Sequence, residues 1–111
     1  MTKLGTASFK GASGHKYEFS IYPIDIKLKE GHGGVYFITA RSEDEHGHHA
    51  HHKLCVGETA DLSNVVETHP DKEDLEQQGA NCICVHATQD PDARDKITND
   101  LTAHYFPPAQ E

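Results

Sequence analysis

The sequence predicts one α+β domain in which helices pack on a small antiparallel sheet. Three observations lead to this fold class. The chain has 111 residues and 35% hydrophobic residues, which suits one domain with one core. Its first third alternates apolar and polar residues, as a β-hairpin does. Its last fifth repeats apolar residues every four positions, as a helix does. We therefore expect a single domain over residues 1–111.

The N-terminal part, residues 1–31, is predicted to be a β-hairpin extension. Residues 6–10 lead into a turn that is rich in glycine and serine at 11–14. The strand that follows is expected to end at Pro23, because proline cannot donate to a sheet ladder. Its apolar residues occupy every second position, and they are Tyr17, Phe19 and Ile21.

The next two strands are predicted at 35–39 and 53–57, where β-branched and aromatic residues gather. The segment between them is biased in composition. Residues 43–53 read Glu-Asp-Glu-His-Gly-His-His-Ala-His-His-Lys. We predict that this His-rich loop forms the long tip of a hairpin.

Two helices and a strand are predicted between 59 and 88. The first helix is capped by Thr59 or Asp61, carries an apolar stripe that includes Leu62, and closes before Pro70. A short acidic helix at 71–78 ends at Gly79. A strand at 81–88 places Cys82 and Cys84 on one face, with Ile83 and Val85 on the other.

The last helix has the strongest signals. Asp90 is a favourable N-cap and Pro91 stands at the favoured first position. Pro107 and Pro108 are expected to stop the helix. Its apolar face consists of Ala93, Ile97, Leu101 and Tyr105.

The formal net charge is −8, from 10 Lys and Arg against 18 Asp and Glu. A protein that holds a polyanion normally presents a basic patch. Residues 58–78 carry seven acids and one base, Lys72. The overall field is therefore expected to repel nucleic acid.

The compartment predicted from the sequence is the cytoplasm. No apolar run approaches the ~20 residues of a membrane span, and residues 1–5 do not resemble a secretory leader. The three cysteines are Cys55, Cys82 and Cys84, an odd number in strand-like contexts. They do not form a disulfide framework, which agrees with an intracellular protein.

The His-rich loop is a candidate metal site. Imidazoles next to carboxylates suit zinc, nickel or copper. The five candidate ligands are His46, His48, His49, His51 and His52. A hairpin tip also tolerates sequence change, so a loose surface cluster is the alternative interpretation.

An ordered set of short motifs resembles the GIY-YIG nuclease domain. Gly34-Val35-Tyr36 is similar to the GIY motif, and the strand that begins at Cys55 is similar to the YIG strand and its exit turn. His69, the strand at 81–86 and the closing helix follow in the family's order. The resemblance implies a GIY-YIG-like core over residues 32–108, with the hairpin in front of it.

The resemblance also implies where catalytic residues should stand. Family nucleases use a tyrosine from each strand motif, an arginine in the first helix and a metal-binding glutamate in the last helix. In this chain Tyr36 matches the first tyrosine, and His69 matches a histidine often found there. Cys55 replaces the second tyrosine, Val65 stands near the arginine position and Thr98 near that of the glutamate.

These departures favour a degenerate domain that acts as a non-enzymatic binding or accessory module for an unknown protein partner. A shift of register would instead make Asp95 or Asp100 the carboxylate. Two other functions stay open: a transition-metal-binding protein that uses the His-rich loop, and a divergent metal-dependent phosphodiesterase. Cys55 as a nucleophile is a further hypothesis, because it precedes a predicted helix start, and a buried inert thiol is the favoured interpretation.

Overall fold

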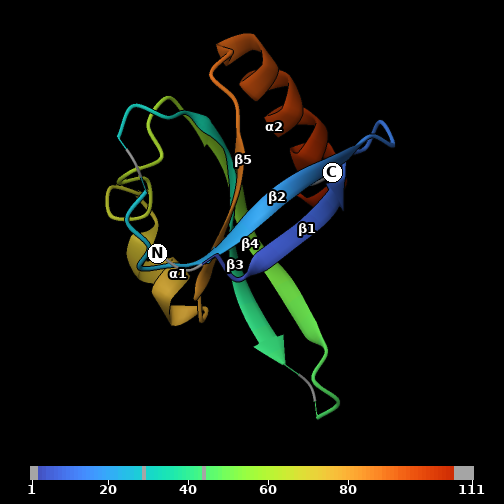
Figure 1. Cartoon of the computed structure of the whole chain (residues 1–111), viewed down its shortest axis with the longest axis vertical. Coiled ribbons are helices and arrows are strands. Elements are labelled where there is room, and N and C mark those ends of the chain that lie inside the picture. Colours follow the sequence, from blue (N-terminus) through green and yellow to red (C-terminus); the bar gives the residue numbers. More distant parts are fainter. Residues whose placement is uncertain (1–2, 29, 44, 107–111) are drawn as a thin grey trace, which may run out of the picture.

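The computed structural model describes residues 3–28, 30–43 and 45–106. Within them, five antiparallel strands form one curled sheet in the order β1-β2-β5-β3-β4, accompanied by two α-helices (Figure 1). The predicted α+β fold class is confirmed. The elements are β1 (Gly5–Lys10), β2 (Lys16–Pro23), β3 (Gly34–Glu43), β4 (His49–Thr59), α1 (Lys72–Gln77), β5 (Cys82–Ala87) and α2 (Pro91–Tyr105).

The predicted N-terminal hairpin is present and belongs to the main sheet. β1 and β2 pair from Gly5 opposite Ile21 to Lys10 opposite Lys16. The other edge of β2 pairs with β5, ending at Pro23. Residues of the predicted extension and of the predicted core therefore share one hydrogen-bonded sheet.

Each face of the sheet carries its own apolar core. We call the side covered by α2 the helix face and the side covered by α1 and the loops around it the loop face. Successive side chains of β5 point to the two cores in turn, as predicted: Cys84 belongs to the helix face and Ile83 to the loop face. The buried helix-face residues are Phe9, Phe19, Ile21, Val35, Phe37, Cys82, Cys84 and Leu101. Those of the loop face are Tyr36, Ile38, Leu62, Leu75, Ile83 and Val85.

The C-terminal helix begins as the sequence predicts. The Asp90 side chain accepts a hydrogen bond from the amide of Asp92, and Pro91 opens the helix. Leu101 is fully buried against the helix face. The helix ends at Tyr105, and the predicted stop at residues 107–108 lies outside the described residues. Among the described helices, none combines the length and apolar character that a membrane crossing requires.

The helix predicted between 59 and 69 is wrong, because residues 63–68 form successive turns. Only isolated turn bonds occur there, such as the Thr68 amide to the Asn64 carbonyl. Side chains compete for the backbone: Asp61 accepts from the Ser63 amide, and the Thr68 hydroxyl donates to the Asn64 carbonyl. The short acidic helix α1 is present, and Gly79 follows it with φ of 88°.

The predicted boundaries of the His-rich loop are also wrong. β3 continues to Glu43 and β4 starts at His49, so the ladder extends through Ala40 opposite His52 and Arg41 opposite His51. Histidine does not prevent strand pairing, and backbone hydrogen bonds across the hairpin continue past the apolar residues. The end of this hairpin projects away from the body of the molecule (Figure 1).

Candidate functional site

The two strand motifs lie side by side, since Tyr36 of β3 is directly opposite Gly57 of β4. A Cβ atom at Gly57 would come within 2.6 Å of the Tyr36 hydroxyl oxygen. A Cβ atom at Gly34 would come within 2.6 Å of the His86 carbonyl oxygen. Both glycines are therefore needed for close packing: Gly57 accommodates the tyrosine ring, and Gly34 allows β3 to approach β5.

Tyr36 is buried on the loop face, with 7% of its surface exposed. Burial raises the pKa of its phenol to about 12, and the negative charges of Cys55 and Glu58 act in the same direction. At neutral pH the phenol therefore keeps its proton. It can donate a hydrogen bond but cannot act as a base.

Cys55 and His69 meet beside Tyr36. The Cys55 Sγ lies 3.7 Å from the His69 Nε2, and the His69 ring stands edge-on to the Tyr36 ring with centroids 6.5 Å apart. The structure thus gathers three of the five motif positions named from the resemblance. His69 reaches this place from the turn segment that precedes α1.

The tautomer of His69 limits what this cluster can do. Its Nδ1 accepts a hydrogen bond of 3.0 Å from the Asp71 amide, so in the neutral ring the proton sits on Nε2. Nε2–H then donates toward the Cys55 sulfur and has no lone pair to receive the thiol proton. Burial also raises the pKa of the Cys55 thiol. Both effects oppose the nucleophile hypothesis for Cys55.

Thr98, which stands near the glutamate position, is not brought to the cluster. It lies on α2, which covers the helix face, whereas Tyr36 and Cys55 belong to the loop face. Its hydroxyl oxygen is buried and has no hydrogen-bond partner among the described residues. Val65, at the expected arginine position, packs against the loop-face core.

The carboxylates considered for a shifted register are engaged elsewhere. Asp100 accepts hydrogen bonds from the Ser13 amide, the Ser13 hydroxyl and the Tyr17 hydroxyl. These bonds, those of Ser13 first, lower the pKa of Asp100. The carboxylate sits directly over Gly11 and holds the β1–β2 turn onto α2. Asp95 is exposed and accepts a bond from Asn99.

Arg94 is a buried cation that the sequence analysis did not identify. Its side chain lies 3.4 Å from the Glu58 carboxylate and donates to the carbonyls of Thr88 and Gln89 at 3.3 and 3.1 Å. It joins the start of α2 to the ends of β4 and β5, with Gly33 packed against it. Arginine side chains are seldom buried, so the sequence did not indicate that Arg94 would lie in the interior.

The predicted metal ligands are distributed over the β3–β4 hairpin. The rings of His46 and His48 are 6.3 Å apart at the exposed tip, and His46 lies 3.7 Å from Glu45. In β4, the His51 Nδ1 is 2.9 Å from the Thr39 hydroxyl, and His52 points to the opposite face of the strand. The His49 side chain lies outside the described part. Among the side chains that are described, no three of His, Cys, Asp or Glu come together as metal ligands.

Comparison with known proteins identifies no relative of this chain. No family model, no curated protein and no solved structure matches the chain. The described residues form an α+β protein with a five-stranded antiparallel sheet. Its distinguishing feature is the Tyr36–Cys55–His69 cluster on the loop face.

Proposed function

We propose that this chain is a catalytically degenerate GIY-YIG-like domain that acts as a non-enzymatic binding module. The observation that carries the proposal is the state of Tyr36. Its phenol is buried over Gly57 and its pKa is about 12. A group packed in this way stabilises the sheet and is not prepared to handle an attacking water.

The surroundings of Tyr36 support the same interpretation. Phosphodiester cleavage by a metal-dependent enzyme needs a carboxylate-held cation and a fixed positive charge near the reacting phosphate. Threonine is a poor ligand for a hard cation, and Thr98 lies on the helix face. The guanidinium of Arg94 is already paired with the Glu58 carboxylate and donates hydrogen bonds to two carbonyl oxygens. The net charge of −8 further opposes nucleic-acid binding.

Incubation with single- and double-stranded DNA and RNA, in Mg²⁺ or Mn²⁺, tests the proposal. We expect no cleavage above a buffer blank, and the same result for Tyr36→Phe. Cleavage by the purified chain that Tyr36→Phe abolishes would contradict the proposal and favour a divergent phosphodiesterase. The matched control is Tyr105→Phe at the end of α2, which removes a phenol hydroxyl on the helix face.

The second candidate function, transition-metal binding, is supported by the neighbouring rings of His46 and His48 beside Glu45. Two exposed imidazoles give an open site, whereas structural zinc normally has four ligands. For a binding module we therefore expect weak zinc binding. In an amide NMR titration, the tip resonances should move in fast exchange without saturating at one equivalent.

The variant His46→Ala should remove most of these shifts. The variant His104→Ala, on the exposed end of α2, should leave them unchanged. Shifts confined to residues 46–52 that saturate near stoichiometric zinc would overturn this expectation. That result would make the metal-binding function the better account of the chain.

A further inference from the structure

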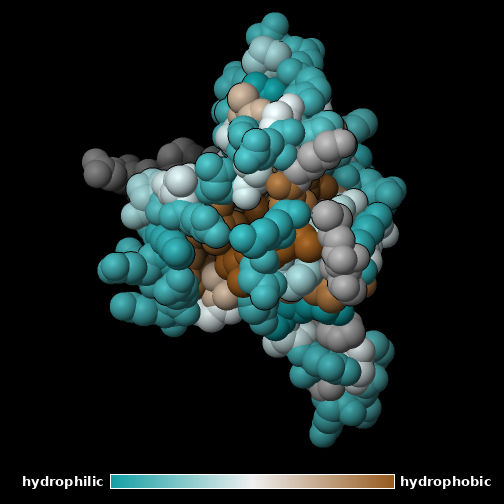
Figure 2. All heavy atoms as spheres, turned by 60° about the vertical axis from the view of Figure 1, so that its left-hand side comes forward, coloured by the Kyte–Doolittle hydropathy of each residue, from teal (hydrophilic) through white to brown (hydrophobic). Residues whose placement is uncertain are grey.

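The loop face carries an apolar groove that the proposed function leaves without an occupant. Figure 2 shows apolar atoms at the floor of a hollow, with hydrophilic side chains around it. One wall is the segment that follows β2, which turns at residues 24–25. In it Ile24, Ile26 and Leu28 pack against the loop-face core, and Asp25 and Lys27 between them are exposed. The other wall comes from residues 62–80.

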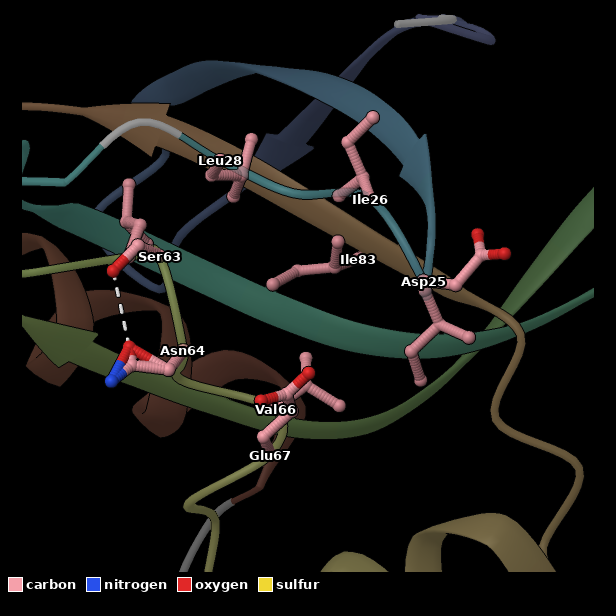
Figure 3. A pocket seen from close by; sticks show the side chains of 10 residues that line it. Asp25, Ile26, Leu28, Ser63, Asn64, Val66, Glu67 and Ile83 are labelled. Carbon is pink, nitrogen blue, oxygen red and sulfur yellow. Dashed lines mark hydrogen bonds between the residues drawn. The ribbon is translucent and has the colours of Figure 1, made fainter.

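The groove consists of two hollows joined by a narrow cleft. One hollow, of about 230 Å³, is lined by Ile24, Val66, Leu75 and Ala80. The other, of about 380 Å³, is lined by Tyr22, Leu28, Leu62 and Val85. The cleft between them, of about 30 Å³, shares residues with both and has Ile83 of β5 as its floor (Figure 3).

The size and shape of these hollows favour apolar side chains as their contents. Pockets for small molecules usually hold ~300–1,000 Å³ and bury most of the ligand. The first hollow is smaller, at about 230 Å³, and the second is open to one side. Two neighbouring apolar hollows of this kind receive successive anchor residues of a peptide better than one compact ligand.

The rim of the groove is acidic around the first hollow. Asp25, Glu67 and Glu76 line the first hollow, and Lys72 is the one basic residue among the described residues of its lining. Figure 3 shows Asp25 and Glu67 at the edge of the cleft, on opposite walls. α1 adds further acids in its first turn, Glu73 and Asp74. This potential attracts a basic segment and repels an acidic one.

We infer that the groove binds a basic amphipathic peptide segment of a partner protein, with at least two large apolar anchors flanked by Lys or Arg. This inference rests on the proposed binding function and names its surface. The charge of the rim argues for this occupant over two others. A second copy of this chain would bring −8 against −8, and nucleic acid would present phosphates to carboxylates.

Selection of peptides from a displayed random library on the full chain tests the inference. We expect the enriched sequences to combine two or more large apolar residues with net positive charge. The most enriched peptide, once synthesised, should shift amide NMR resonances at 22–28 and 62–80. Enrichment of neutral or acidic peptides, shifts elsewhere on the fold, or no enrichment would overturn the inference. Binding elsewhere would leave the proposed binding module intact, whereas nucleic-acid cleavage by the chain would contradict it.

A pair of charge-reversal variants sharpens the test. Glu67→Lys removes a rim carboxylate, and Asp95→Lys makes the same change on exposed α2, outside the residues that line the groove. For an interaction at an exposed site, we expect Glu67→Lys to weaken peptide binding about fivefold and Asp95→Lys by less than about twofold. Leu28→Ser, which alters the wall of the second hollow and of the cleft, should weaken binding at least as much. Equal effects of Glu67→Lys and Asp95→Lys would mean that only overall charge matters, and would contradict the groove as the site.

Discussion

Replacing Phe37 with alanine should destabilise the protein by about 3–5 kcal/mol, the usual cost of deleting a buried aromatic side chain. Phe37 is fully buried at the centre of the helix face. Its ring centroid lies 4.9 Å from that of Phe9, 5.3 Å from that of Phe19 and 5.7 Å from that of Tyr105. Alanine would leave a cavity bordered by β1, β2 and α2. The hydrogen-bonded sheet limits how far these elements can move to fill it.

Urea unfolding followed by circular dichroism measures this effect. The control is Leu4→Ala, at a leucine that is 41% exposed. We expect it to change the free energy of unfolding by no more than about 0.5 kcal/mol. A loss below about 1.5 kcal/mol for Phe37→Ala would place it outside the range for buried aromatics and would contradict the described core.

Alkaline pH should destabilise the fold through Cys84. The side chain is fully buried, and burial raises the pKa of its thiol from 9.0 to about 12, against a hydrogen bond with Thr39 that lowers it. In the unfolded chain the thiol loses its proton near pH 9, whereas in the folded chain it keeps that proton. The unfolded state therefore binds fewer protons, and the free energy of unfolding should fall by about 1.4 kcal/mol per pH unit above pH 9.

The decline should fade below pH 9 and be absent near about pH 7, where the thiol is protonated in both states. Urea unfolding at successive pH values, with reductant present, gives the slope. Cys84→Ala should make the slope between pH 9 and pH 10 shallower, and comparison with the parent separates this thiol from Tyr36, whose phenol in the unfolded chain begins to ionise in the same range. The same slope in the parent and in Cys84→Ala would show that this thiol is not the group responsible.

Local signals in the sequence predicted part of the fold well. Asp90 and Pro91 start α2 because a cap and a proline act within one turn of the chain. The alternation along β5 divides the two cores because side chains of a strand point to opposite faces. One error arose where distant strand pairing decides the outcome, and the other where side chains compete locally for the backbone. His49–His52 lie in a strand because β3 continues alongside them, and residues 63–68 form turns because polar side chains compete for their backbone.

The candidate site was predictable only in part. The strand motifs could be expected to pair, which places Tyr36 opposite Gly57. The approach of His69 to Cys55 depends on the path of the turns before α1, and no local pattern specifies that path. The position of Thr98 depends on which face of the sheet α2 covers, which is settled by packing of apolar side chains such as Leu101.

The most direct test of the central claim is the titration of the Tyr36 phenol, followed by NMR of protein with ¹³C-labelled tyrosine and assigned with Tyr36→Phe. A buried, non-catalytic phenol should remain protonated through pH 10 and have a pKa of about 12, compared with an ordinary value of 10.0. A pKa at or below 10.0 would mean that the phenol is accessible or activated. The proposal of a catalytically degenerate domain would then be wrong, and a catalytic role for Tyr36 would explain the site better.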